Sequence, residues 1–154
     1  MKRVVNLLID KKKTISTMES CTGGALANSI SNIEGCSDIF KFSAVTYSNL
    51  YKIKMGVSED IIDKYSVYSI EVAREMSKSI SYFADSSYGV GITGKLNRID
   101  KNNLYGEDNL VFVSIYDRES DKFYDYSLSV SSGERCLVKE EVVLSVIEKL
   151  LEII

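Results

Sequence analysis

Residues 14–32 have the sequence T-I-S-T-M-E-S-C-T-G-G-A-L-A-N-S-I-S-N, and this stretch decides the fold class. Thr14–Met18 is short and rich in β-branched residues, which predicts a strand. Ala25–Asn32 has a helical pattern, and the turn 19–24 between them ends in two glycines. A strand that turns directly into a helix is typical of α/β proteins, in which ligands gather at strand ends.

Further elements are predicted on both sides of this stretch. Lys2–Lys12 places apolar residues at helical intervals, and Phe40–Tyr47 alternates loosely and predicts a second strand. Segment 48–80 is predicted to be helical in pieces, with Ser58 and Ser69 as N-caps because acidic residues follow each of them. Helices therefore alternate with strands in the first half of the chain.

The second half of the chain predicts a different arrangement. Tyr88–Ile92 is an expected strand, and the polar segment Lys95–Asn109 is an expected loop. Leu110–Tyr116 and Phe123–Val130 predict a hairpin, and Glu134–Ile153 predicts a long amphipathic helix. This order of elements predicts an α/β fold with a mixed sheet covered by helices.

Length and composition indicate one ordinary globular domain. The chain has 154 residues, so residues 1–154 are expected to form a single domain. The net charge is −3 and the basic residues are spread among acidic ones, which argues against a nucleic-acid-binding face. No stretch approaches the roughly 18 apolar residues of a membrane span, so no membrane association is expected. The odd number of cysteines, three, argues against a disulfide framework and favours a reduced cytoplasm.

The sequence contains no histidine, which limits the catalytic mechanisms and metal sites that are possible. Ser-His-Asp and Cys-His mechanisms and His-ligated metal sites are excluded. We expect no metal and no other cofactor. A base for proton transfer would have to be Lys, Asp, Glu, Tyr or Cys.

The turn after the first strand is the first candidate site. Ser20 stands at the strand end, and Cys21, Thr22, Gly23 and Gly24 lead into the helix. Backbone N–H groups at a helix start can stabilise an oxyanion or hold a phosphate. Cys21 competes with Ser20 as a nucleophile, since a helix N-terminus lowers a thiol pKa. The alternative is that Ser20 only caps the helix and that the turn binds nothing.

The turn after the second strand is the second candidate site. If a helix begins near Ser48 or Asn49, Lys52 lies in its first turn, where a cation is unfavourable. A lysine held there would have a lowered pKa, as a lysine base requires. The alternatives are a solvated surface lysine at position 52 and a core aromatic ring at Tyr47. A third turn, Gly91–Lys95, suits a ligand or a plain tight turn equally well.

Four motifs stand out along the chain: T-M-E-S-C-T-G-G-A-L-A at 17–27, A-V-T-Y-S-N-L-Y-K at 44–52, V-Y-S-I-E-V-A at 67–73 and G-I-T-G at 91–94. Together they resemble the C-terminal domain of the competence/damage-inducible CinA proteins. Their order and spacing fit the family over nearly the whole chain. The resemblance implies a three-layer α/β/α sandwich with a mixed sheet.

The resemblance also implies an activity, because stand-alone members of the family are nicotinamide-nucleotide amidohydrolases. It makes Ser20 the nucleophile, Lys52 its base and Tyr47 a proton relay or orienting hydroxyl. The expected substrate is the small nucleotide nicotinamide mononucleotide, and a homodimer is an expected assembly. The expected substrate-binding residues come from the same three turns: Cys21, Thr22, Gly23, Gly24, Ser48, Asn49, Thr93, Gly94, Lys95 and Arg98.

The segment after Thr93-Gly94 departs from the family pattern. Members continue with Ile-Ala-Gly-Pro and a glycine-rich loop, whereas this chain has K-L-N-R at 95–98 and G-E-D-N at 106–109. Lys95 and Arg98 are candidates for phosphate contacts in place of the family loop. The departure leaves two alternatives open: the same mechanism acting on a different small amide, and a nucleotide-binding module without catalysis.

Overall fold

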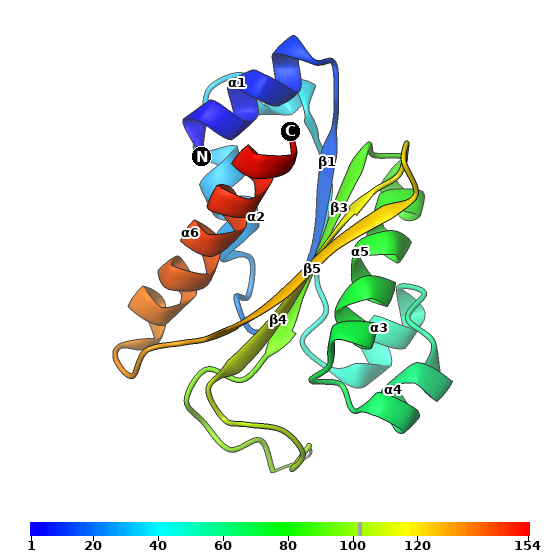
Figure 1. Ribbon diagram of the computed structural model, residues 1–154, viewed down its shortest axis with the longest axis vertical. Coiled ribbons are helices and arrows are strands. Elements are labelled where there is room, and N and C mark those ends of the chain that lie inside the picture. The colour runs from blue at the N-terminus through cyan, green and yellow to red at the C-terminus, as the bar shows by residue number, and fades with distance from the viewer. Residues whose placement is uncertain (102) are drawn as a thin grey trace.

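A central five-stranded sheet organises the computed structural model, which describes residues 1–101 and 103–154 (Figure 1). The strands are β1 Ile15–Glu19, β2 Phe40–Val45, β3 Tyr88–Gly94, β4 Leu110–Asp117 and β5 Lys122–Ser129. The helices are α1 Lys2–Asp10, α2 Ala25–Ser31, α3 Asn49–Lys54, α4 Glu59–Tyr65, α5 Ile70–Ala84 and α6 Arg135–Ile153, with a 3-10 turn η1 at Cys36–Asp38.

The sheet is mixed, as the sequence predicted. Its strand order is β2-β1-β3-β4-β5. β1 runs parallel to both β2 and β3, whereas β4 is antiparallel to β3 and to β5. The carboxyl ends of β1, β2 and β3 therefore lie at one edge, where the three candidate turns meet.

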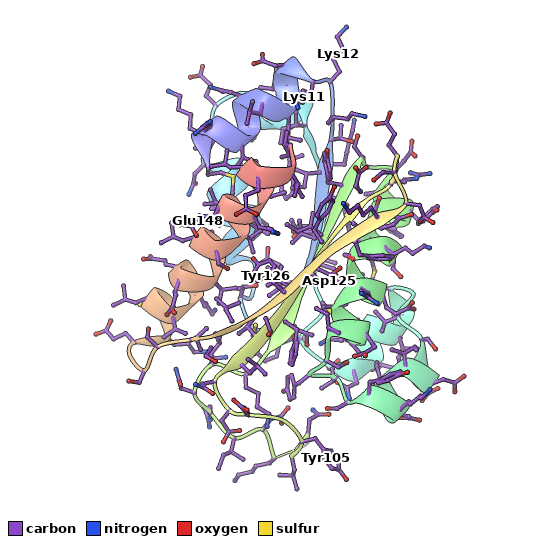
Figure 2. The ribbon with its side chains drawn as sticks, viewed as in Figure 1. Lys11, Lys12, Tyr105, Asp125, Tyr126 and Glu148 are labelled. Carbon is purple, nitrogen blue, oxygen red and sulfur yellow. The ribbon has the colours of Figure 1, made fainter. Side chains whose placement is uncertain are left out.

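Helices cover both faces of the sheet and complete three layers (Figure 1). One core joins α1, α2 and α6 to the sheet, and a second core lies under α4 and α5. Successive side chains of β5 point to opposite faces of the sheet. Tyr126 bonds to Ser145 of α6 on one face, and Asp125 pairs with Arg74 of α5 on the other (Figure 2).

Helix α5 lies against β3 at two glycines of the strand, where there is no room for a Cβ atom. A Cβ on Gly91 would lie 2.2 Å from the carbonyl oxygen of Ala73, and one on Gly89 would lie 2.0 Å from that of Ser77. Real Cβ atoms do not approach backbone so closely. The two glycines thus set the spacing between α5 and the sheet.

The predicted elements are confirmed, and their ends differ from prediction by a few residues. Helix α1 ends at Asp10 instead of Lys12, and β2 ends at Val45 instead of Tyr47. Ser69 caps α5 as predicted, accepting a hydrogen bond from Val72 N at 3.3 Å. Ser58 stands at the N-cap of α4, but its side chain accepts no capping bond, which corrects the prediction for that residue.

Within the described residues, no helix combines the length and the apolar character needed to cross a bilayer.

Replacing Gly91 with alanine should destabilise the protein strongly. The added Cβ meets backbone atoms of α5, so the helix must move away from β3. We expect the free energy of unfolding to fall by about 3 kcal/mol, measured by urea denaturation. Gly133→Ala is the matched control, because nothing lies within 4 Å of its Cβ. Equal stability of the two variants would refute this account of α5–β3 spacing.

Candidate active site

Ser20 is fixed in a turn that continues directly from β1. Its backbone N–H donates to the carbonyl of Ile92 at 3.0 Å, and its own carbonyl accepts from Gly23 N at 3.0 Å. The residue is nearly buried, with 7 % of its surface exposed. A side chain held this way presents its hydroxyl in one place.

The start of α2 is occupied by the carboxylate of Glu19. Its Oε2 accepts from the backbone N–H groups of Gly24 and Leu26, both at 3.1 Å, and its Oε1 accepts from Ala27 N at 2.8 Å. Glu19 is fully buried. The helix-start amides that the sequence analysis assigned to a ligand therefore bind a carboxylate of the chain itself, which corrects that prediction.

This arrangement also removes the alternative that Ser20 is only a helix cap. The N-cap of α2 is Gly24, with a left-handed φ of 93°. The amides of Cys21 and Thr22 donate to no protein acceptor in the part of the chain that the structure describes. Of the two residues, only Cys21 lines the cavity over Ser20, so its N–H group is the donor placed for a ligand oxygen.

Lys52 reaches Ser20 from helix α3, which begins at Asn49 as predicted. Ser48 caps this helix by accepting from Tyr51 N. Lys52 Nζ donates to Ser20 Oγ at 3.0 Å and to the carbonyl of Thr46 at 2.7 Å. The side chain is only 1 % exposed, so the alternative of a solvated surface lysine is wrong.

Burial shifts the pKa values of the two titratable groups beside Ser20 in opposite directions. It lowers the pKa of Lys52 to about 8, against smaller raising effects of Cys21 and Asp100. The lowered pKa was predicted, but its main cause is desolvation and not the helix start. Burial raises the pKa of the Cys21 thiol to about 12, so this thiol stays protonated at neutral pH and is a poor nucleophile.

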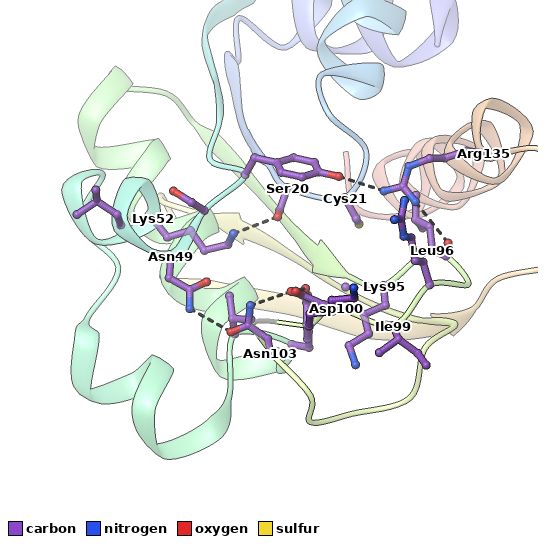
Figure 3. Close-up of a pocket in the computed structure, with 18 residues that line it drawn as sticks. Ser20, Cys21, Asn49, Lys52, Lys95, Leu96, Ile99, Asp100, Asn103 and Arg135 are labelled. Atoms are coloured by element: carbon purple, nitrogen blue, oxygen red, sulfur yellow. Dashed lines mark hydrogen bonds between the residues drawn. The ribbon is translucent and has the colours of Figure 1, made fainter.

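A cavity of about 850 Å³ opens over Ser20 and Lys52 (Figure 3). Nine of the predicted site residues line it: Ser20, Cys21, Tyr47, Ser48, Asn49, Lys52, Gly94, Lys95 and Arg98. Thr22, Gly23, Gly24 and Thr93 do not. Thr93 is buried, and its hydroxyl donates to the carbonyl of Val67 at 2.9 Å. This hydroxyl is therefore used in a hydrogen bond within the protein.

Tyr47 lies at the cavity but does not contact the Ser20–Lys52 pair. Its hydroxyl accepts from Arg135 Nη2 at 3.1 Å, and the residue is 65 % exposed. This placement corrects two expectations. The ring is not a core aromatic, and the hydroxyl is directed at α6 and not at the groups that would exchange a proton.

Lys95 also differs from its predicted role. It is 3 % exposed, and its Nζ bonds to Asp108 Oδ1 at 3.1 Å and to the carbonyl of Gly106 at 3.3 Å. Its charge is therefore compensated inside the loop 95–109. Arg98 of the same loop is exposed at the cavity and is the better placed cation for an anionic ligand. Position 102 of this loop lies outside the described residues.

Several cavity residues were not predicted from the sequence. Arg135 comes from the first residue of α6, and Tyr68, Asp100, Lys101 and Asn103 come from the α4–α5 connection and the loop. A cation at a helix start is unfavourable, and this signal, used for Lys52, would also have identified Arg135. No comparable signal marks the other four.

Comparisons with known proteins agree on one family. The family model of the CinA C-terminal domain matches residues 1–154. The chain is 35 % identical over 143 residues to a putative competence-damage inducible protein of Clostridium kluyveri, covering 92 % of this chain and 34 % of that protein. It is 43 % identical over 114 residues to one of Clostridium beijerinckii, covering 73 % and 28 %. The chain thus spans about a third or less of the length of these curated relatives.

Solved structures show the same fold. A CinA superfamily protein of Escherichia coli superposes with a TM-score of 0.90 at 24 % identity, covering 99 % of this chain and 87 % of that one. A competence/damage inducible protein of Agrobacterium tumefaciens gives 0.87 at 22 % identity, covering 97 % and 90 %. The predicted family and three-layer fold are confirmed.

Removing the Glu19 carboxylate should destabilise the fold. Glu19→Ala leaves three amide donors without their acceptor, and an unsatisfied buried donor costs about 1–3 kcal/mol. We expect the free energy of unfolding to fall by about 3 kcal/mol, measured by chemical denaturation. Glu34→Ala, at an exposed position of the following turn, should change it little. A loss below about 1 kcal/mol at position 19 would contradict the role given to its carboxylate.

Proposed function

The chain belongs to the CinA C-terminal domain family, and we propose that it is an amidohydrolase that converts nicotinamide mononucleotide to nicotinate mononucleotide and ammonia. The observation that carries this proposal is the contact of 3.0 Å between Lys52 Nζ and Ser20 Oγ at the floor of the cavity. A nucleophile and a base within hydrogen-bond reach are what acyl transfer requires.

The first half-reaction is acylation of Ser20. In its neutral form Lys52 accepts the Ser20 hydroxyl proton as Oγ attacks the carboxamide carbon. The tetrahedral oxyanion that forms needs N–H donors, and the amide of Cys21, a residue that lines the cavity beside the nucleophile, is the candidate. Lys52 then gives its proton to the amide nitrogen, and ammonia leaves as the C–N bond breaks.

The second half-reaction releases the acid product. Water attacks the acyl carbon of the ester on Ser20, and Lys52 takes the proton from this water. The C–O bond to Ser20 breaks, Oγ recovers a proton from Lys52, and the carboxylate product departs. The carbonyl of Thr46 keeps Nζ in place through both steps, since it accepts from Nζ at 2.7 Å.

The phosphate of the substrate has three candidate cations. Arg98, Lys101 and Arg135 line the cavity and are exposed. Guanidinium groups bind phosphate oxygens in bidentate geometry. Lys95 is not proposed for this role, because Asp108 and Gly106 already bind its Nζ.

A second candidate function is the same mechanism on another small amide. The specific observation in its favour is the loop 95–109, whose Lys95 is tied to Asp108 and whose sequence departs from the family pattern. This candidate retains Ser20 and Lys52 in the same roles.

Ammonia release from nicotinamide mononucleotide tests the proposal directly. We expect activity in the unaltered protein, a loss of more than about a thousandfold in Ser20→Ala, and a loss of roughly a hundredfold to ten-thousandfold in Lys52→Met. Lys54→Met alters an exposed lysine of the same helix and should leave the rate unchanged. Full activity in Ser20→Ala would remove the proposed nucleophile, and no activity in folded unaltered protein would remove the substrate.

The rate should depend on pH through Lys52. Because the pKa of this amine is about 8 and only the neutral form accepts a proton, kcat/KM should rise with pH and reach half its maximum near pH 8. The measurement is a profile of ammonia release between pH 6 and 10. A rate that is flat across this range, or that falls as pH rises through 8, would contradict the assignment of Lys52 as the base.

A further inference from the structure

One wall of the cavity is a chain of hydrogen-bonded groups that does not include Ser20 or Lys52 (Figure 3). Asn49 Nδ2, at the start of α3, donates to Asn103 Oδ1 at 3.2 Å. Asn103 Nδ2 donates in turn to Asp100 Oδ2 at 2.8 Å. The loop 95–109 is thereby attached to the helix that carries Lys52.

Asp100 is the acidic member of this wall, and its contacts include two side-chain hydrogen bonds. Besides Asn103, it accepts from the Tyr68 hydroxyl at 2.5 Å, and Tyr68 precedes α5. The residue is partly buried and lines the cavity. An ionised carboxylate offers about four lone pairs, so it can accept from ligand hydroxyls as well as from protein donors.

The charges around the cavity separate two kinds of ligand group. Arg98, Lys101 and Arg135 attract an anion, whereas the Asp100 carboxylate repels one and accepts hydrogen bonds from neutral donors. Carboxylates bind the hydroxyls of ribose in dinucleotide sites for the same reason. The wall formed by Asn49, Asn103 and Asp100 suits a sugar better than a phosphate.

We propose that Asp100 accepts hydrogen bonds from the ribose hydroxyls of the substrate and so selects amides that carry a ribose. Asn103 and Tyr68 are positioning residues that hold the carboxylate at the cavity. This inference rests on the proposed function, because it takes the substrate to be a nucleotide, and it assigns the part of the nucleotide that the loop recognises.

Binding to the Ser20→Ala variant tests the inference without turnover. The ligands are nicotinamide mononucleotide and its 2′-deoxy-2′-fluoro and 3′-deoxy analogues, measured by calorimetry. Asp100→Asn in this background keeps the size of the side chain and removes its charge. Glu107→Gln in the same background is the matched control, since Glu107 is an exposed carboxylate of the same loop that does not line the cavity.

We expect Asp100→Asn to weaken the binding of nicotinamide mononucleotide roughly tenfold to a hundredfold, as for a lost hydrogen bond to a charged group. For at least one analogue, which lacks a hydroxyl that Asp100 binds, the loss of affinity should be several-fold smaller. Glu107→Gln should leave the affinity for all three ligands unchanged. Equal losses for all three ligands would mean that Asp100 only shapes the loop and would overturn the inference, as would an absence of binding by Ser20→Ala itself.

The outcomes separate this inference from the proposed function. Ammonia release by the unaltered protein, with equal losses for all ligands in Asp100→Asn, would keep the function and overturn the ribose assignment. Hydroxyl-dependent binding without ammonia release from nicotinamide mononucleotide would support the ribose assignment and refute the proposed reaction.

Discussion

The buried residue Glu19 anchors the two segments that bring Ser20 and Lys52 together. Its side chain binds the amides of Gly24, Leu26 and Ala27, and its backbone carbonyl accepts from Thr46 N at 2.8 Å. The side-chain contacts fix the turn that carries Ser20, and the backbone contact fixes the segment whose carbonyl accepts from Lys52. One residue therefore ties both halves of the Ser20–Lys52 pair to the sheet. It also satisfies a helix start that would otherwise attract a ligand anion.

The parallel part of the sheet explains why the sequence could predict that Ser20 and Lys52 lie close together. Ser20 follows β1 and Lys52 lies just after β2, and the carboxyl ends of neighbouring parallel strands share one edge. Local patterns predict strands and helix starts, so they place both residues at that edge. The role of Glu19 was not predictable in this way, since only the packing of α2 on the sheet shows where its carboxylate lies. Ser58 failed as a capping side chain for a related reason: a favourable residue type does not fix a rotamer.

The loop 95–109 shows where sequence reasoning ends. A polar segment without periodicity gives no indication of which side chains turn inward. Lys95 was predicted to meet the substrate and is bound within the loop, whereas Asp100 and Asn103 were not predicted and line the cavity. Arg135 reaches the same cavity from α6, which no local pattern connects to β1. The residues that line this side of the cavity are thus brought there by tertiary structure and not by a local pattern.

Burying Lys52 has an energetic cost, which is visible in the lowered pKa of its amine. A native pKa of about 8, below the ordinary 10.5, means that the unfolded chain binds more protons between pH 8 and 10.5. The contribution of this group to stability is therefore complete above the unfolded pKa and is lost as the pH falls toward 8. At neutral pH the buried amine is mostly protonated, and its desolvated charge lowers the stability of the folded state. The same burial lets the amine lose its proton more readily than a solvated lysine does. The Thr46 carbonyl and the Ser20 hydroxyl offset part of that cost, and both contacts depend on the segments that Glu19 fixes.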